Sequence, residues 1–488
     1  MTTIASPTAA RRLASFASTA LADGVPDEVA ASVRRRVLDV LGLCVAAYRL
    51  PTSHAIAAHV ADQGGRAEAT AIGVAAQVPA VGAAFVNGVL AHSLDYDDTH
   101  LPSVLHPSAS VVPAALAAAQ ASGASGADVV AAVAVGLEIT VRLGMAGYDS
   151  ELGNSVYFEH GQHATSICGA MGSAAAAALL YGLGEEGVLN AMGVTASFAS
   201  GVIEANRTGG TVKRLHCGWA AQSGVTAAQL VRRGFTGPPT VLEGRFGFFQ
   251  SFLRGQVDLD QVTDGLGEDW AVPGIFFKPY PANHFTHTAI DAGLRLRADG
   301  APTDPADVAS IELRVPNAVI RTIGQPIETK RAPETGYQAQ FSGPYAVVTG
   351  LLGGSGLGAG LADYSDDLAA DPLRRALMST VDVVPDERCD AIFPHQFPAV
   401  VTVRGTDGRE WTAEVLTNRG GPQRPLTDAE LAAKFTDNVA DRLPPEIAAS
   451  VRDLVLGLED VTDVGELLRP LALATDHTPT TGDDHDVP

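Results

Sequence analysis

One short stretch of the chain, residues 91–110, gathers the side chains best suited to acid–base chemistry. It reads AHSLDYDDTHLPSVLHPSAS and holds three histidines and three aspartates in an otherwise Ala-, Val- and Gly-rich sequence. Two later segments, GQHATSICGAMGSAAAAALLYG from Gly161 and GTVKRLHCGWAAQSGVTAAQLVRRG from Gly210, share one feature with it. In each segment a histidine or lysine comes directly before a predicted helix of small residues. The pattern predicts that His106, His163 and Lys213 lie at helix N-termini.

Cations at helix N-termini favour the binding of anions. A helix N-terminus has unpaired N–H groups and about half a unit of positive charge, which add to the charge of the side chains. The natural small ligand of such a site is a di- or tricarboxylate. The alternative for any one of these histidines is a structural role, in which it caps a turn or binds helix-end carbonyls.

Length and charge narrow the class of protein. A chain of 488 residues is longer than one hydrophobic core usually supports, so we expect two domains. The chain has 33 Lys and Arg against 55 Asp and Glu, a net charge of -22, which argues against nucleic acid or an anionic membrane as a partner. An anionic substrate must therefore bind at a local cationic site within an acidic protein.

Targeting and cysteine signals point to a cytoplasmic protein. The first 30 residues contain no continuous apolar segment with a cleavage site, and charge or Gly interrupts the Ala-rich runs too early for a membrane span. The cysteines are scattered without a CxxC pair, which predicts no zinc knuckle, disulfide framework or iron–sulfur cluster. We expect packing roles for them; they are Cys44, Cys168, Cys217 and Cys389.

The chain divides into a helical part and a mixed part. Residues 1–270 have helical spacing of apolar residues, for example at 28–46, at 127–143 and after His163 and Lys213. Strand-like runs appear at 308–315, 399–403 and 411–416, with a hairpin signal at 405–408 and helices at 289–296 and 345–352. The helical pattern returns after Pro425, where Thr427 and Glu430 form a capping-box motif.

We therefore predict a mainly α fold. A large all-helical domain comprises residues 1–270 and 421–471, contributed by both ends of the chain, and an α+β lid domain of residues 271–420 is inserted between them. Residues 472–488, rich in Asp, Thr and Pro, are predicted to be a disordered tail.

The motifs resemble those of the MmgE/PrpD family, which includes 2-methylcitrate dehydratase, cis-aconitate decarboxylase and iminodisuccinate epimerase. The resemblance covers about residues 25–471 and rests on the order and spacing of HSLDYDDTH with HPSA, GQHATSICGAMGSAAAAA, KRLHCGWAAQSG, RGFTGPPTVLEGRFGFF and FKPYPANHFTHTAIDA. It implies a mostly helical domain with an inserted lid, a homodimer, and a cofactor-free active site between the two domains.

The resemblance also implies a set of site residues. The first motif supplies Asp95, Thr99 and His106, although the stretch between Thr99 and His106 is one residue longer than in the decarboxylase. The second motif supplies His163, which Ala164 follows in place of the family's proline. The remaining motifs supply two lysines of the cleft and a tyrosine of the lid segment FSGPY: Lys213, Lys278 and Tyr345.

These residue types suit carbanion chemistry beside a carboxylate. Such a reaction develops enolate-like negative charge, which fixed cations stabilise, and it needs a positioned acid or base. We expect Lys213 and Lys278 to bind substrate carboxylates, and Asp95 and Thr99 to orient a neighbour or bind the substrate. The acid–base residues are then His106, His163 and Tyr345, with Lys213 also counted as catalytic.

Other motifs allow different interpretations. Asp97, Asp98 and His100 could form a hard-metal site, but a run of acids at a helix end is more often a solvated cap. His284 and His287 lie three residues apart and could be ligands, although such a pair is more often one packed and one exposed side chain. The sequence GGSGLGAG, residues 353–360, lacks the dinucleotide-binding spacing and is predicted to be a flexible loop.

The sequence therefore predicts a lyase that needs no metal or cofactor and acts on a small di- or tricarboxylate. A hydro-lyase similar to 2-methylcitrate dehydratase is the first choice. Decarboxylation of cis-aconitate and epimerisation of iminodisuccinate are alternatives, since all three reactions begin with charge development beside a carboxylate. A metal-dependent hydrolase and a non-catalytic oligomeric binding protein are the alternatives from other classes.

Overall fold

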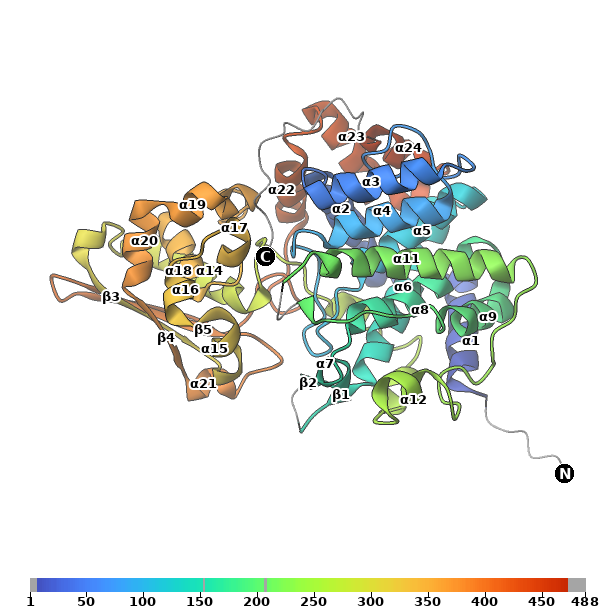
Figure 1. The fold of residues 1–488 in the computed structure, drawn as a ribbon, viewed down its shortest axis with the longest axis horizontal. Coiled ribbons are helices and arrows are strands. Elements are labelled where there is room, and N and C mark those ends of the chain that lie inside the picture. The colour runs from blue at the N-terminus through green and yellow to red at the C-terminus, as the bar shows by residue number, and fades with distance from the viewer. Residues whose placement is uncertain (1–6, 152–153, 206–208, 473–488) are drawn as a thin grey trace. The chain divides into compact units, whose positions relative to one another are not determined.

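The computed structural model describes residues 7–151, 154–205 and 209–472 and is mainly helical, with 57% helix and 8% strand (Figure 1). The chain forms two compact units. Unit 1 contains the chain up to Ile275 and again from Asn438, and unit 2 runs from Phe276 to Asp437. Nearly all of the predicted tail lies outside the described residues. No helix among the described residues is long and apolar enough to cross a membrane.

Unit 1 is built from helices, most of them buried along one or more faces. The helices predicted at 28–46 and 127–143 are confirmed to within two residues at each end. The longer helices of the unit are α1 (Ala9–Asp23), α2 (Asp27–Ala47), α3 (Pro51–Gln63), α4 (Ala80–His92), α5 (Ser108–Ser122), α6 (Gly126–Met145), α8 (Ala164–Leu180), α9 (Gly184–Thr195), α11 (Val212–Val231) and α23 (Pro445–Leu456). Shorter elements are β1 (Tyr148–Asp149), β2 (Asn154–Ser155), α7 (Val156–Glu159), α12 (Phe248–Leu253), α13 (Asp260–Thr263) and α24 (Gly465–Leu468).

Small residues allow the central helices of unit 1 to pack closely. Helix α11 packs most extensively against α4 and α8. A Cβ atom at Gly88 on α4 would lie 2.7 Å from the Cα of Gly218 on α11, and one at Gly224 would lie 2.5 Å from the backbone of α8. Only glycine permits such a close approach of two backbones. The close packing brings the C-terminus of α4 and the N-termini of α8 and α11 together.

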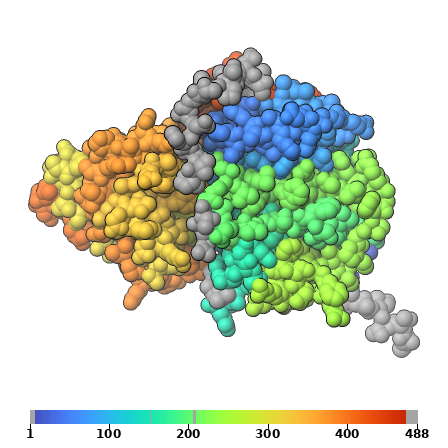
Figure 2. Space-filling view, in the orientation of Figure 1, coloured from blue at the N-terminus to red at the C-terminus, as the bar shows by residue number. Residues whose placement is uncertain are grey.

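Helix α11 has one buried side and one exposed side. Its exposed side lies on the surface of unit 1, where Leu215 is 37% and Trp219 41% exposed (Figure 2). His216 and Cys217 are buried on the other side. One side of the first turns of α11 therefore faces solvent, and the other side faces the interior of unit 1.

Unit 2 contains a four-stranded mixed sheet with the strand order β4-β3-β5-β6. Its strands are β3 (Val308–Val315), β4 (Val381–Pro385), β5 (Ala399–Gly405) and β6 (Glu410–Val415), and β5 and β6 form the predicted antiparallel hairpin. Helices α14 (His287–Ala298) and α18 (Gly343–Leu352) pack together, and α14 covers β5 and β6. Strand β4 was not predicted from the sequence; it pairs with β3 in parallel, and this partner is distant in the chain.

Shorter helices complete unit 2. They are α15 (Asn317–Ile323), α16 (Ile327–Arg331), α17 (Gly336–Ala339), α19 (Asp366–Ala370), α20 (Pro372–Ser379) and α21 (Glu387–Asp390). The stretch at 353–360 is a loop, as the sequence predicted.

The second boundary between the units lies inside helix α22 (Asp428–Val439), later than the expected boundary near residue 420. The predicted capping box is confirmed, since the N–H of Glu430 donates to Thr427 Oγ1 at 3.2 Å and the N–H of Thr427 donates to Glu430 Oε2 at 2.7 Å. Leu426 and Leu431 pack against Phe277 of unit 2. Because of this contact, the first part of α22 belongs to unit 2, and the boundary lies later than the start of the helix.

Candidate active site

The three predicted cations of unit 1 lie at helix N-termini. His106 comes two residues before α5, His163 is the N-cap of α8, and Lys213 is the second residue of α11. The N–H of His106 donates to Thr165 Oγ1 at 3.2 Å, which links the start of α5 to the start of α8. The positive ends of these helices therefore raise the local potential together, and the ammonium group of Lys213 adds its charge.

Four histidines form a continuous cluster at this point. The ring centroid of His92, the last residue of α4, lies 5.3 Å from that of His106 and 5.6 Å from that of His163. The ring of His163 lies 4.9 Å from that of His216, and their Nδ1 atoms are 2.9 Å apart. All four side chains are buried. We call these residues the histidine cluster.

Each aspartate of the DYDD motif binds a different basic group. Asp95 Oδ1 lies 3.4 Å from Lys213 Nζ. Asp97 Oδ2 lies 2.7 Å from Nδ1 of His92, and the side chains of both residues are fully buried. The carboxylate of Asp98 accepts from Arg36 at 2.8 Å. The three carboxylates therefore face three different basic groups, and Asp97 Oδ2 also lies 3.9 Å from Nδ1 of His106.

His106 is oriented by the backbone. Its Nδ1 lies 2.7 Å from the carbonyl oxygen of Asp98. Because a carbonyl only accepts, Nδ1 carries the hydrogen, and in the neutral ring Nε2 carries the lone pair. Thr99 Oγ1 lies 3.4 Å from the same Nδ1. In the neutral ring, Nε2 is therefore the nitrogen that can accept a proton.

The stretch between Thr99 and His106 forms a closed loop. His100 and Leu105 pair across it, with backbone N···O distances of 2.8 and 3.3 Å. Val104 has φ +52°, an unusual value for a β-branched residue. The pairing joins the two ends of this loop directly before His106.

Burial and neighbouring charge keep two cluster histidines neutral. Burial lowers the pKa of His163 well below its ordinary value, and the neighbouring basic groups His92, His216 and Lys213 lower it further. Burial also lowers the pKa of His216 to about 4, with further contributions from His92 and Lys213. Both rings are therefore neutral near pH 7 in the free protein.

Lys278 and Tyr345 belong to unit 2, and both are buried. The hydroxyl of Tyr345 donates to the carbonyl oxygen of Asp363 at 2.5 Å, and the ring lies in the hydrophobic core of the unit. Burial raises the pKa of this hydroxyl to about 12. In this conformation the Tyr345 hydroxyl donates its proton to a backbone carbonyl. Transfer of that proton to a substrate stays a prediction.

In the part of the chain that the structure describes, the residues of the alternative motifs form no metal-binding group. Among the described residues, no group of three or more His, Cys, Asp or Glu is placed to hold a metal ion. His100 Nδ1 lies 2.7 Å from Ser103 Oγ, while Asp97 and Asp98 bind other residues. The rings of His284 and His287 are both buried and lie 4.5 Å apart, which differs from the expected packed and exposed pair.

The cysteines are buried thiols. Burial raises the pKa of Cys168 to about 12 and raises that of Cys217 as well. A thiol with a raised pKa is protonated and unreactive near pH 7, which suits the packing role expected from the sequence.

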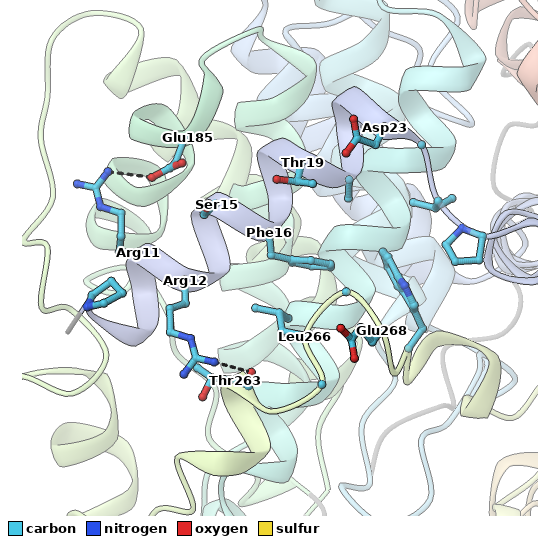
Figure 3. Close-up of a pocket in the computed structure, with 18 residues that line it drawn as sticks. Arg11, Arg12, Ser15, Phe16, Thr19, Asp23, Glu185, Thr263, Leu266 and Glu268 are labelled. Atoms are coloured by element: carbon cyan, nitrogen blue, oxygen red, sulfur yellow. Dashed lines mark hydrogen bonds and ion pairs between the residues drawn. The ribbon is translucent and has the colours of Figure 1, made fainter.

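A separate surface pocket of about 950 Å³ lies beside α1 (Figure 3). Phe16, Leu266 and Trp270 supply its apolar lining. Arg11 pairs with Glu185, and Arg12 donates to the carbonyl of Thr263 at 3.0 Å, so both guanidinium groups are already bound. None of the predicted site residues lines this pocket.

Two members of the cluster, His92 and His216, were not among the predicted site residues. The sequence contains a signal for each of them. His92 lies in the same motif as Asp97, and His216 follows Lys213 by three residues, a spacing that places two side chains on one side of a helix. Nε2 of His92 is buried and has no hydrogen-bond partner among the described residues.

Comparison with known proteins adds an independent observation. The MmgE/PrpD N-terminal domain matches residues 11–260, and the MmgE/PrpD C-terminal domain matches residues 280–460. Cis-aconitate decarboxylase of Homo sapiens is 30% identical over 462 residues, which cover 90% of each chain. Cis-aconitate decarboxylase of Aspergillus terreus is 25% identical and covers 93% of this chain and 94% of its own. 2-Methylcitrate dehydratase of Cupriavidus necator is 27% identical over 290 residues, 56% of this chain and 57% of its own.

Proposed function

The chain belongs to the MmgE/PrpD family, and from this premise we propose that it is a lyase that acts on a small tricarboxylate using only its own side chains. The observation that carries the proposal is the histidine cluster, which lies with Lys213 at the N-termini of three helices. Decarboxylation of cis-aconitate is the first candidate reaction. The decarboxylases match almost the whole chain, whereas the dehydratase from Cupriavidus necator matches little more than half.

The arrangement suits a polyanion that brings its own negative charge. Asp95, Asp97 and Asp98 each bind another residue, and His163 and His216 are neutral in the free protein. A bound carboxylate would therefore supply the counter-charge that these imidazoles lack, and Lys213 would form a charge-assisted hydrogen bond to it. We assign a second carboxylate to Lys278, as the family resemblance implies.

Decarboxylation of cis-aconitate requires one proton per turnover. The carboxylate on the methylene carbon leaves as carbon dioxide, and its bonding electrons form a new double bond to the central carbon. The original double bond opens, and its electrons take a proton at the other end, which gives itaconate. We assign this proton to His163 and the stabilisation of the developing negative charge to Lys213.

Dehydration of 2-methylcitrate is the second candidate, supported by the match to a dehydratase. This reaction requires a base to remove a proton beside a carboxylate and an acid to protonate the leaving hydroxyl. His106, whose neutral ring has its lone pair on Nε2, is the proposed base, and His163 is the proposed acid. We also retain the homodimer implied by the family as a proposal, tested by light scattering of the purified protein.

The decisive experiment offers the purified protein four acids in separate reactions: cis-aconitate, 2-methylcitrate, citrate and iminodisuccinate. NMR identifies each product, and the His163→Asn variant serves as the site control. We expect itaconate and carbon dioxide from cis-aconitate, with loss of the activity in the variant. Water loss from 2-methylcitrate alone would support the second candidate. Absence of turnover with all four acids would refute the proposed function.

A further inference from the structure

His216 is joined to His163 by an uncommon contact between two imidazoles. It lies one turn after Lys213 on α11, its side chain is buried, and its Nδ1 is 2.9 Å from Nδ1 of His163. We propose that His216 is a positioning residue that holds Nδ1 of His163, so that His163 exchanges protons with the substrate through Nε2. The inference rests on the proposed function, since it assigns a role in that reaction.

The geometry limits how many protons the two rings can hold. A hydrogen bond between two Nδ1 atoms contains one proton, because one nitrogen must donate and the other must accept. If both rings were imidazolium, two N–H groups would point at each other. His163 and His216 therefore share at most one positive charge, and the Nδ1 atoms of both rings are used by this bond.

The surroundings explain why that charge is absent from the free protein. The titratable groups that act on the pair are His92 on α4, His106 before α5 and Lys213 on α11. Asp95 and Asp97 lie nearby but bind Lys213 and His92. A proton added to the pair would therefore enter a buried, already basic region without a carboxylate of its own.

A polycarboxylate changes this balance because it brings the missing negative charge. We expect the pair to take up one proton when such a ligand binds and to hold it on His163. His216 accepts the Nδ1–H of that imidazolium, which leaves the Nε2 proton for transfer to the substrate carbon. Lys213 and His216 lie three residues apart on one helix, so the proposed carboxylate-binding lysine and the positioning histidine belong to the same element.

The test compares two substitutions that differ in one hydrogen-bonding group. His216→Asn keeps a side-chain acceptor near the position of Nδ1, whereas His216→Leu removes it. We expect His216→Leu to lower kcat about 10- to 1,000-fold, part of the usual contribution of a general acid, and His216→Asn to recover most of that loss. The matched control is His59→Leu on the exposed side of α3, which should leave kcat unchanged.

A second measurement uses the free protein and requires no substrate. Nitrogen-15 NMR of labelled histidines reports which ring nitrogen carries the proton, and the His163→Asn and His216→Asn variants assign the two signals. Between pH 6 and 8, about the range around the ordinary histidine pKa, we expect one Nδ1 to be protonated and the other unprotonated. Addition of tricarballylate, an unreactive tricarboxylate, should convert His163 to the doubly protonated form.

Different results would refute the role of His216 and the proposed function. Wild-type kcat and pH profile in His216→Leu, or two protonated Nδ1 atoms in the free protein, would overturn the role of His216. If the wild-type protein converts none of the acids, the proposed function fails, while the spectra of the free protein still decide the hydrogen bond. If His216→Leu does not fold, the wild-type spectra and the kcat of His216→Asn decide.

Discussion

Replacement of Lys213 by methionine tests the electrostatic basis of the proposed site. The substitution keeps most of the length and apolar volume of the side chain and removes its charge. In the free protein Nζ lies 3.4 Å from Asp95 Oδ1, and the Lys213 side chain is 26% exposed. In the complex the same ammonium group is proposed to bind a substrate carboxylate. We expect a large loss of kcat/KM with little loss of secondary structure.

The magnitude follows from the distance and the exposure of the charge. Two unit charges about 4 Å apart interact by roughly 4 kcal/mol at an effective dielectric constant of about 20. Partial exposure of Lys213 weakens this to about 2 to 3 kcal/mol. Because about 1.4 kcal/mol corresponds to a tenfold change, kcat/KM should fall about 30- to 150-fold. The remaining carboxylate of Asp95 repels the substrate and adds to this loss.

The assay measures kcat/KM for the wild type, Lys213→Met, Asp95→Asn and the double variant. Without Lys213, the carboxylate of Asp95 repels the substrate. The double variant should therefore lose less transition-state stabilisation than the sum of the losses in the two single variants. Arg214→Met is the matched control, because Arg214 is the next residue of α11 and its guanidinium binds Thr52 Oγ1 at 3.2 Å. Near-native kcat/KM in a folded Lys213→Met protein would refute the reasoning.

Three further predictions concern Tyr345, metal ions and acid stability. Tyr345→Phe should lower the free energy of unfolding, measured by urea denaturation, by about 1 to 2 kcal/mol, because the hydrogen bond to Asp363 is lost. A hundredfold fall in kcat at unchanged stability would instead support proton donation by Tyr345. Activity should survive EDTA and dialysis, and rescue of an inactive dialysed protein by Mg²⁺, Zn²⁺ or Fe²⁺ would contradict the proposed chemistry. The pKa of His216 is about 4 in the folded protein and near 6.5 in the unfolded chain. Between these values the unfolded chain binds more protons, so the free energy of unfolding falls as the pH drops from 7 to 4. His216→Asn should remove about 2 to 3 kcal/mol of that fall in urea titrations, and identical curves for variant and wild type would refute it.

Local signals in the sequence predicted most elements that carry the site. The apolar spacing of α2 and α6, the turn between β5 and β6 and the capping box of Thr427 and Glu430 all depend on residues close together in the chain. The same is true of the positions of His106, His163 and Lys213 at helix N-termini, since small helix-forming residues follow each of them. Such features require no knowledge of distant contacts.

The sequence alone determined the mainly helical fold, the family and the residue types of the candidate site, because periodicity, capping and motif order are properties of neighbouring residues. Only the tertiary structure decided which partner each group binds. The division of three aspartates among Lys213, His92 and Arg36 depends on segments far apart in the chain. The contact between His163 and His216 depends on the close packing of α8 and α11, and the burial of Tyr345 depends on the core of unit 2. Hydrogen bonds and pKa shifts depend on distance and burial, which folding sets.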